Sequence, residues 1–362
     1  MHDDMNLNNY ISGMSLGTSN DSACSIHVAL HKDTNTFVVI KKYLIDNQDS
    51  EDYNLIQQEI ITTRQLQHPN VLPYLNAFIS GPNVYVLSPL MSYGSCSEII
   101  SQYFKEGLPE LTIAHILRDV LCGLEYIHKK GFILRALKAS HILISSDGQA
   151  CICGMKYSCE VFGSGKWQKT VYSFPASTRK NLKWLSPEVL QQDLRGYNEK
   201  SDIYSLGITI CELANGIVPF ALETDILMLT EKVKDSIPTI IDNTTFPFDV
   251  MDLEEMEEQT QGQEVPRNFR QMANRTFSGS FHEITERCLQ LNPNARPGAS
   301  ALLMHPFIKQ CRRSDPVVLN TLKSIKPLHE SFVETLENQA TDLANTMGNM
   351  ELDDYQWDFE NT

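Results

Sequence analysis

The amino-acid sequence predicts an α+β fold with two lobes, a small β-rich lobe followed by a larger, mostly helical lobe. Short runs of β-branched and aromatic residues, separated by turn residues, fill much of the chain before Ser92. After Ser92 the apolar residues recur at the three- and four-residue spacing of amphipathic helices. The 362 residues, 42% of them hydrophobic, are enough to build a sizeable core.

The first lobe is expected to contain strands and one helix. Residues 24–45 read as a β-hairpin, because two β-branched runs flank the polar turn Lys32–Asn35. Residues 51–67 place apolar side chains at the spacing of an amphipathic helix. Residues 68–90 supply two more strands, with a turn at Gly81–Asn83.

Helices are expected to dominate the second lobe. Residues 111–130 have a broad apolar face, and residues 201–214 are apolar almost throughout, which predicts a buried helix. Residues 281–291 and 298–311 read as two more helices.

Two segments depart from this pattern. Residues 249–265 are acidic and lack aromatic side chains, a composition that favours a mobile insert. Residues 312–362 form a tail with one helical stretch and the terminal sequence DDYQWDFENT.

Bulk properties exclude several classes of function. The net charge of −15 disfavours broad binding to nucleic acid or to an anionic membrane. No apolar run of about 20 residues and no secretory signal is visible. The nine cysteines are irregularly spaced, which indicates a reducing, cytoplasmic or nuclear setting.

Residues 130–156 (KGFILRALKASHILISSDGQACICGMK) have the layout of a protein kinase catalytic loop and metal-binding loop. Other kinase motifs stand at the expected places in the chain. They are Val38–Lys41 on a strand, Glu59 in the following helix, Leu185–Glu188, Asp202–Gly207, Asn292–Pro297 and His305–Phe307. The chain therefore resembles a bilobal protein kinase over residues 10–311, with an N-lobe at about 10–91 and a C-lobe at about 92–311.

Within the kinases, several segments of the sequence are similar to those of the STE-20-related adaptor (STRAD) pseudokinases. The segments that carry this resemblance are KASHILIS, WLSPEVLQQ, GYNEKSDIYSLGITICELANG and the terminal Trp357-Asp358-Phe359.

Three positions lack the groups that phosphoryl transfer needs. Ala136 stands in place of the carboxylate that accepts the substrate proton, and Gly154 in place of the aspartate that holds the first metal. His141 replaces the asparagine that binds a second metal. We therefore expect a catalytically inactive chain, not an enzyme. The alternative is a weakly active or atypical Ser/Thr kinase with relocated chemistry.

The resemblance also implies a nucleotide site. Lys41 would hold phosphates and pair with Glu59, although a purely structural ion pair is an alternative. Only Gly17 remains of the glycine-rich loop, so residues 16–26 also read as an ordinary strand turn. The expected nucleotide-binding residues are Gly17, Val39, Lys41, Glu59, Ser88, Leu90, Met91, Leu143 and Lys156.

STRAD relatives imply ATP as a structural ligand. The missing metal-binding aspartate at Gly154 implies that such an ATP does not require magnesium, and no resident metal is expected. Lys156, where the glycine of the metal-binding loop would be, could replace part of the metal charge, although an ordinary solvated lysine is the plainer interpretation. Cys151 and Cys153 share one face of a strand, but their spacing does not suit a structural zinc site.

The resemblance implies two protein partners, while the net charge and the lack of a long apolar run predict neither nucleic acid nor membrane as a partner. One is a Ser/Thr kinase of the liver kinase B type, which this chain would activate allosterically. The other is a helical-repeat scaffold of the mouse protein 25 type, docked by Trp357, Asp358 and Phe359. A pseudokinase with unrelated partners remains an alternative. In many kinases the arginine at the position of Arg135 pairs with a phosphorylated activation segment, here residues 157–183, in which no single phosphorylated residue can be nominated. Glu188 would pair with Arg296 inside the C-lobe.

Overall fold

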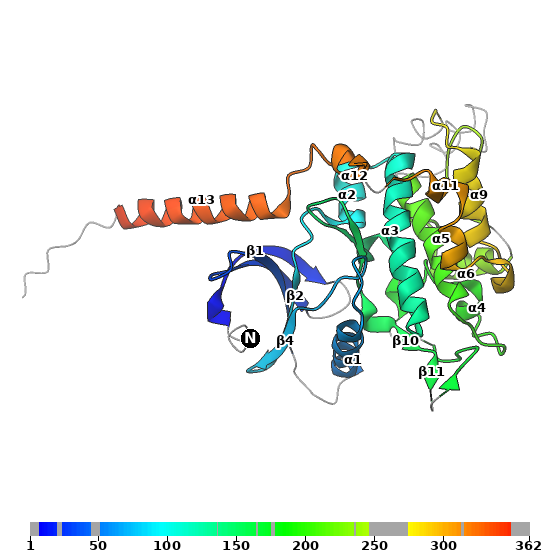
Figure 1. The fold of residues 1–362 in the computed structure, drawn as a ribbon, viewed down its shortest axis with the longest axis horizontal. Coiled ribbons are helices and arrows are strands. Elements are labelled where there is room, and N and C mark those ends of the chain that lie inside the picture. Colours follow the sequence, from blue (N-terminus) through cyan, green and yellow to red (C-terminus); the bar gives the residue numbers. More distant parts are fainter. Residues whose placement is uncertain are drawn as a thin grey trace, which may run out of the picture.

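The computed structural model describes residues 7–19, 24–44, 51–135, 137–163, 166–174, 178–234, 237–245, 274–312 and 315–348 (Figure 1). Ala136, the expected insert at 249–265 and the docking motif at 357–359 lie outside these residues. Within the described chain, no helix is both long and apolar enough to cross a membrane.

The N-lobe is built on one antiparallel sheet of five strands in the order β1-β2-β3-β5-β4. The expected hairpin is confirmed, with its two strands joined by the turn at Lys32–Asn35. The first strand, β1, was not predicted, because its sequence YISGMSLGTS does not alternate cleanly and its pairing is interrupted by two register shifts. The elements are β1 Tyr10–Ser19, β2 Cys24–His31, β3 Phe37–Leu44, α1 Glu51–Gln65, β4 Asn76–Ser80 and β5 Asn83–Pro89, preceded by a 3-10 turn at Leu7–Asn9.

The C-lobe is organised around two buried helices, as the sequence predicts. One carries a broad buried face, and the other is buried at nearly every position. The helices are α2 Cys96–Tyr103, α3 Glu110–Lys129, α4 Pro187–Leu190, α5 Lys200–Asn215, α6 Asp225–Val233, α9 Gly279–Cys288, α10 Ala299–Leu302, α11 Pro306–Lys309, α12 Val317–Thr321 and α13 Leu328–Gly348. The short strands are β6 Gly94–Ser95, β7 Phe132–Ile133, β8 Ile142–Ile144, β9 Ala150–Ile152, β10 Cys159–Glu160, β11 Phe162–Gly163 and β12 Lys166–Trp167. Short 3-10 helices cover Ala139–His141, Met155–Tyr157, Thr178–Asn181 and Pro293–Ala295.

The expectation of one helix over 298–311 is wrong, because the segment forms two short helices. Pro306 begins α11, since proline suits the first turn of a helix but lacks the N–H group that a continuous helix would use. The side chain of His305 accepts a hydrogen bond from the amide of Phe307 and caps this second helix.

Arg296 and Glu188 form the expected ion pair in the C-lobe. The guanidinium is 1% exposed and donates two hydrogen bonds to the carboxylate, at 2.6 and 2.9 Å. Its remaining N–H groups donate to the backbone carbonyls of Gln290, Leu291 and Lys200. The pair ties α4 to the loop before α10, so its role is structural.

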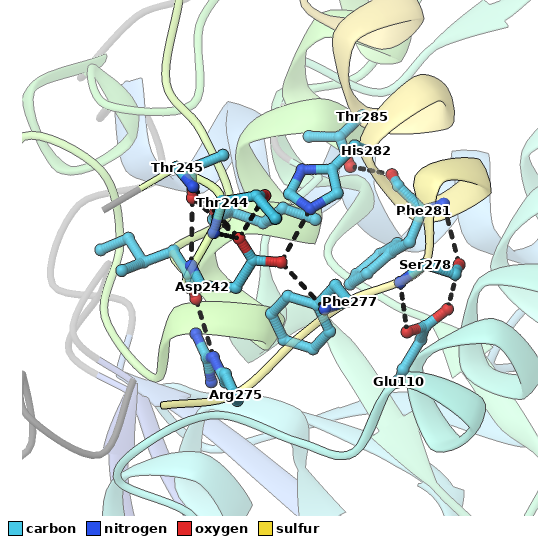
Figure 2. Close-up of polar contacts among 12 residues, drawn as sticks. Glu110, Asp242, Thr244, Thr245, Arg275, Phe277, Ser278, Phe281, His282 and Thr285 are labelled. Carbon is cyan, nitrogen blue, oxygen red and sulfur yellow. Dashed lines mark hydrogen bonds and ion pairs between the residues drawn. The ribbon is translucent and has the colours of Figure 1, made fainter. Parts of the chain in front are cut away.

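A second polar cluster lies where residues 245 and 274 flank the segment outside the described residues (Figure 2). Asp242 is fully buried and accepts hydrogen bonds from the amides of Thr244, Thr245 and Phe277, the Thr244 hydroxyl and His282 Nε2. Burial alone would raise the pKa of Asp242, but these hydrogen bonds outweigh burial and hold the pKa well below its ordinary value. The carboxylate thus connects Thr244 and Thr245 to Phe277 and to His282 of α9.

The tail beyond residue 315 spans the two lobes. Thr321 of α12 meets Thr112 of α3 through their hydroxyls, 2.7 Å apart, and α13 then runs across β1 of the N-lobe (Figure 1). The predicted tail helix is therefore present, and it packs against the first strand of the sheet.

Candidate functional site

A cleft of about 680 Å³ opens between the sheet of the N-lobe and the C-lobe. Eight of the nine residues expected at a nucleotide site line this one cleft. They are Val39, Lys41, Glu59, Ser88, Leu90, Met91, Leu143 and Lys156. Their role in binding a nucleotide remains a prediction.

Gly17 is the expected residue that does not line the cleft. The cleft wall at β1 comes instead from Met14, Ser15 and Leu16. Gly17 has a φ of +105°, a conformation that glycine adopts without strain. Gly17 lies at a register shift of β1, and its neighbours Met14, Ser15 and Leu16 line the cleft.

Lys41 and Glu59 meet through a tyrosine that the sequence did not single out. The Lys41 ammonium lies 3.9 Å from the Glu59 carboxylate. The hydroxyl of Tyr74 lies between them, donating to Glu59 at 2.5 Å and accepting from Lys41 at 3.4 Å. The expected pair therefore forms as a three-membered chain.

The surroundings of Lys41, Tyr74 and Glu59 determine which of these three side chains carry a proton. Burial and the Glu59 charge raise the pKa of Tyr74 far above its ordinary value, so its hydroxyl keeps its proton. Burial lowers the pKa of Lys41, but the acidic neighbours Tyr43 and Glu59 more than reverse this effect and raise it. Lys41 is therefore a cation that faces the cleft.

Asp202 shapes the segment that would be a catalytic loop. Its carboxylate is fully buried and accepts from the amides of Leu134 and Arg135, each at 2.8 Å. It also lies 2.8 Å from Nε2 of His128. Arg135 has a φ of +60°, which is uncommon for a residue with a side chain, and the Asp202 contacts compensate for that strain.

Arg135 contacts residues of the segment 157–183, the expected activation segment. Its guanidinium donates to the carbonyl of Tyr157 at 2.6 Å and to the hydroxyl of Tyr197 at 2.9 Å. It also donates to the carbonyl and hydroxyl of Ser173 at 3.3 Å. Tyr197 in turn donates to the Ser173 carbonyl at 2.5 Å. Arg135 therefore joins residues 157, 173 and 197 with its own hydrogen bonds.

His141 occupies the space beside Gly154. A Cβ atom added at Gly154 would come within 2.7 Å of His141 Nδ1, and Gly154 has a φ of +83°. A carboxylate side chain at position 154 would therefore be strained and would displace the imidazole. The two substitutions at the expected metal positions fit one another.

Lys156 is buried, so the interpretation of it as an ordinary solvated lysine is wrong. It is 6% exposed and contributes to the cleft wall from the 3-10 helix Met155–Tyr157. Lys138, 9% exposed, also lines the cleft, and its ammonium donates to Asn181 Oδ1 at 2.9 Å. Four lysines, Lys41, Lys138, Lys156 and Lys326, thus line one cleft, which suits an anionic ligand.

Cys151 of β9 and Cys153, which directly follows this strand, are expected to keep their thiol protons. Burial raises the pKa of Cys151 to about 12 and that of Cys153 to about 11. The Cys151 thiol donates to the carbonyl of Pro69 at 3.1 Å. Cys151 belongs to a small apolar cluster with Leu72 and Met91, and Cys153 packs against it, so these side chains suit a packing role.

The cleft also includes residues that sequence reasoning missed. Ile325, Lys326 and Leu328 come from the tail, far along the chain from the motifs. Tyr74 was missed as well, since it lies in an irregular segment before β4. None of these residues belongs to a local pattern, so only the folded arrangement places them here.

Known proteins resemble the chain over nearly its whole length. The family described as "Protein kinase domain" matches residues 10–308. The STE20-related kinase adapter protein alpha of Mus musculus is 36% identical over 359 residues, which cover 95% of this chain and 83% of the relative. The Homo sapiens alpha protein has the same identity and coverage. The Homo sapiens beta protein is 37% identical over 320 residues, covering 85% of this chain and 77% of the relative. The chain therefore belongs to the protein kinase family and, within it, to the STE20-related kinase adapter proteins, STRAD.

Proposed function

We propose that this chain is a catalytically inactive adaptor that binds a partner Ser/Thr kinase and shifts it to its active state. The observation that carries this proposal is the fit between His141 and Gly154. The cleft keeps its lysines, but the position expected for the first metal-binding carboxylate holds no side chain and is closed by an imidazole. Phosphoryl transfer depends on oxygen ligands at that place.

The cleft is suited to hold ATP as a structural ligand without magnesium. An adenine ring needs a flat, largely apolar slot, which Val39, Met91 and Leu143 would provide. The triphosphate carries three or four negative charges, and Lys41 and Lys156 would balance part of them. A bound nucleotide would join both lobes, because Lys41 belongs to the N-lobe and Lys156 to the C-lobe.

The partner kinase, of the liver kinase B type, would bind the C-lobe face formed by residues 171–174, 178–197 and 220–233. Exposed apolar side chains gather on these segments, among them Tyr172, Leu194, Leu222 and Ile226. Lys183 connects the segments by donating to the carbonyl of Ala221 at 3.2 Å. Apolar anchors of this kind dominate protein interfaces.

Activation of the partner would follow from population shift. The partner's active state must bind this face more tightly than its inactive state does. The Arg135 contacts to Ser173 and Tyr197 hold residues 171–174 against the C-lobe. A helical-repeat scaffold of the mouse protein 25 type would bind Trp357, Asp358 and Phe359 and stabilise the assembly.

Catalysis and nucleotide binding are tested together on the purified chain. Thermal unfolding with ATP, with and without magnesium, should show a rise in melting temperature that does not need the metal. Lys41→Ala should reduce that rise. Radiolabel transferred from ATP to a peptide by this chain, and lost in Lys41→Ala, would instead support the weakly active kinase.

Partner activation is tested by reconstitution. The activity of the partner kinase on a peptide is measured with the wild-type chain and with the double variant Leu222→Ala, Ile226→Ala. Activation should fall by tenfold or more with the double variant, on the order of the burial of two aliphatic side chains. Ile79→Ala, which alters a similarly exposed residue on β4 of the N-lobe, should leave activation unchanged. Equal activation by all three proteins would place the partner elsewhere.

A further inference from the structure

We infer that the tail segment from α12 to the first turns of α13 is an intramolecular clamp that forms one side of the cleft, so that a nucleotide in the cleft and the seated tail stabilise one another. The second half of this inference rests on the proposed binding of ATP. The first half concerns the protein alone.

The clamp is fixed to the C-lobe at its beginning. Val318, Leu322 and Ile325 are buried and belong to the apolar core of the C-lobe. The Thr321 hydroxyl lies 2.7 Å from that of Thr112 on α3. This part of the tail is therefore an integral layer of the lobe.

The clamp then crosses the chain that joins the lobes. The amide of Leu328 donates to the carbonyl of Ser92 at 2.7 Å, directly after the cleft residue Met91. Ile325, Lys326 and Leu328 line the cleft together with the residues expected to receive a nucleotide. A ligand that fills the cleft would lie against the tail.

The clamp is fixed to the N-lobe at its end. Phe332 of α13 is fully buried, and its ring packs edge-on against Phe37 of β3 with centroids 5.7 Å apart. Gly13 of β1 makes room for it, because a Cβ atom there would lie 2.9 Å from the Phe332 ring and 3.3 Å from Leu336. Figure 1 shows the helix passing across this strand.

These contacts connect the lobes through the tail, in addition to the polypeptide that joins them. Opening the cleft requires the N-lobe to move relative to the C-lobe, and the tail is bonded to both. Reciprocity then demands that a ligand favouring the closed cleft also favours the seated tail, by the same factor.

The experiment uses amide hydrogen exchange on the full chain without ligand. Gly13→Ala pushes a methyl group into the Phe332 ring, and Phe332→Ala removes the ring. Both should speed exchange at residues 328–336 by about tenfold or more, equal to about 1.4 kcal/mol. They should also speed exchange at residues 88–95, which neither substitution touches.

Two matched controls separate the clamp from general loosening. Val333→Ala alters the next residue of α13, which is 42% exposed. Gly279→Ala adds a methyl group at a position with no heavy atom within 4 Å. Neither should change exchange at residues 88–95. If Gly13→Ala and Phe332→Ala also leave those residues unchanged, the tail is only a local covering and the clamp is refuted.

Adding ATP then tests whether the tail forms one side of the cleft that binds the nucleotide. If ATP raises the melting temperature and slows exchange at residues 322–336, the linkage holds, and Gly13→Ala should weaken ATP binding about fivefold. If ATP raises the melting temperature but leaves those residues unchanged, the linkage is refuted. If ATP has no effect on the melting temperature, the proposed nucleotide site fails, the linkage fails with it, and the clamp stands or falls by the ligand-free exchange.

Discussion

Replacing Asp242 by alanine is expected to lower the free energy of unfolding by about 3–5 kcal/mol. The carboxylate is fully buried and accepts five hydrogen bonds of 3.2 Å or less (Figure 2). A hydrogen bond to a charged group contributes about 1.5–3 kcal/mol, but these bonds share one acceptor and are not additive. The net loss of unfolding free energy in Asp242→Ala is reduced because the His282 side chain is 18% exposed and can form a hydrogen bond with water instead.

The measurement is urea unfolding followed by circular dichroism, with the midpoint and slope fitted for each variant. Glu125→Ala, which breaks the exposed helical pair with Lys129, is the control and should change stability by less than about 0.5 kcal/mol. A loss below about 1 kcal/mol for Asp242→Ala would refute the view that this carboxylate fastens the C-lobe.

The same group predicts a pH dependence with a definite sign. Because folding lowers the pKa of Asp242, its contribution is fully present above the unfolded pKa of about 4 and is lost as the pH falls toward the folded value. The stability difference between the wild type and Asp242→Asn should therefore stay constant above about pH 5 and shrink as the pH falls from about 5 to about 2. A difference that stays constant over that range would show that the charge is not what stabilises the site.

Three further predictions concern buried polar groups near the cleft and in the C-lobe. Tyr74→Phe removes the hydroxyl that donates to Glu59 and should cost about 1–2 kcal/mol in urea unfolding, whereas an unchanged midpoint would argue against the chain of contacts. Gly154→Asp should lower the free energy of unfolding by about 1–3 kcal/mol, because position 154 has a positive φ and lies against the imidazole of His141. Adding His141→Asn should recover part of the melting temperature. A Gly154→Asp variant as stable as the wild type would contradict the observed crowding. Arg296→Met should cost about 3–5 kcal/mol by leaving its carboxylate partner unpaired in the core, and a loss within 1 kcal/mol would mean that water reaches the site.

Local pattern was enough to predict most of the fold. The β2–β3 hairpin and helices α3 and α5 follow from alternation, turn residues and helical periodicity, which depend on neighbours in sequence. β1 escaped prediction because its polar residues and register shifts hide the alternation. The break between α10 and α11 was signalled by His305-Pro306, but the apolar pattern on both sides concealed it.

The cleft could be predicted only where kinase motifs mark it. Lys41 and Glu59 were found in this way, but Tyr74 lies 33 residues from Lys41 and belongs to no motif. The burial of Lys156 depends on packing around the cleft, which sequence spacing does not encode. Leu328 and Ser92 are separated in sequence by the C-lobe, and the Leu328 amide reaches the Ser92 carbonyl only when that lobe is folded.

The seating of Phe332 has a practical consequence for where this protein can be cut. The matched kinase domain ends at residue 308, whereas α13 begins at Leu328. A fragment trimmed to that boundary would expose the Phe37 ring and the strip of β1 around Gly13 to solvent, and bare apolar surface of this kind promotes aggregation. We therefore expect the smallest well-behaved fragment to extend through residue 336, so that the unit that folds is longer than the unit that sequence families define.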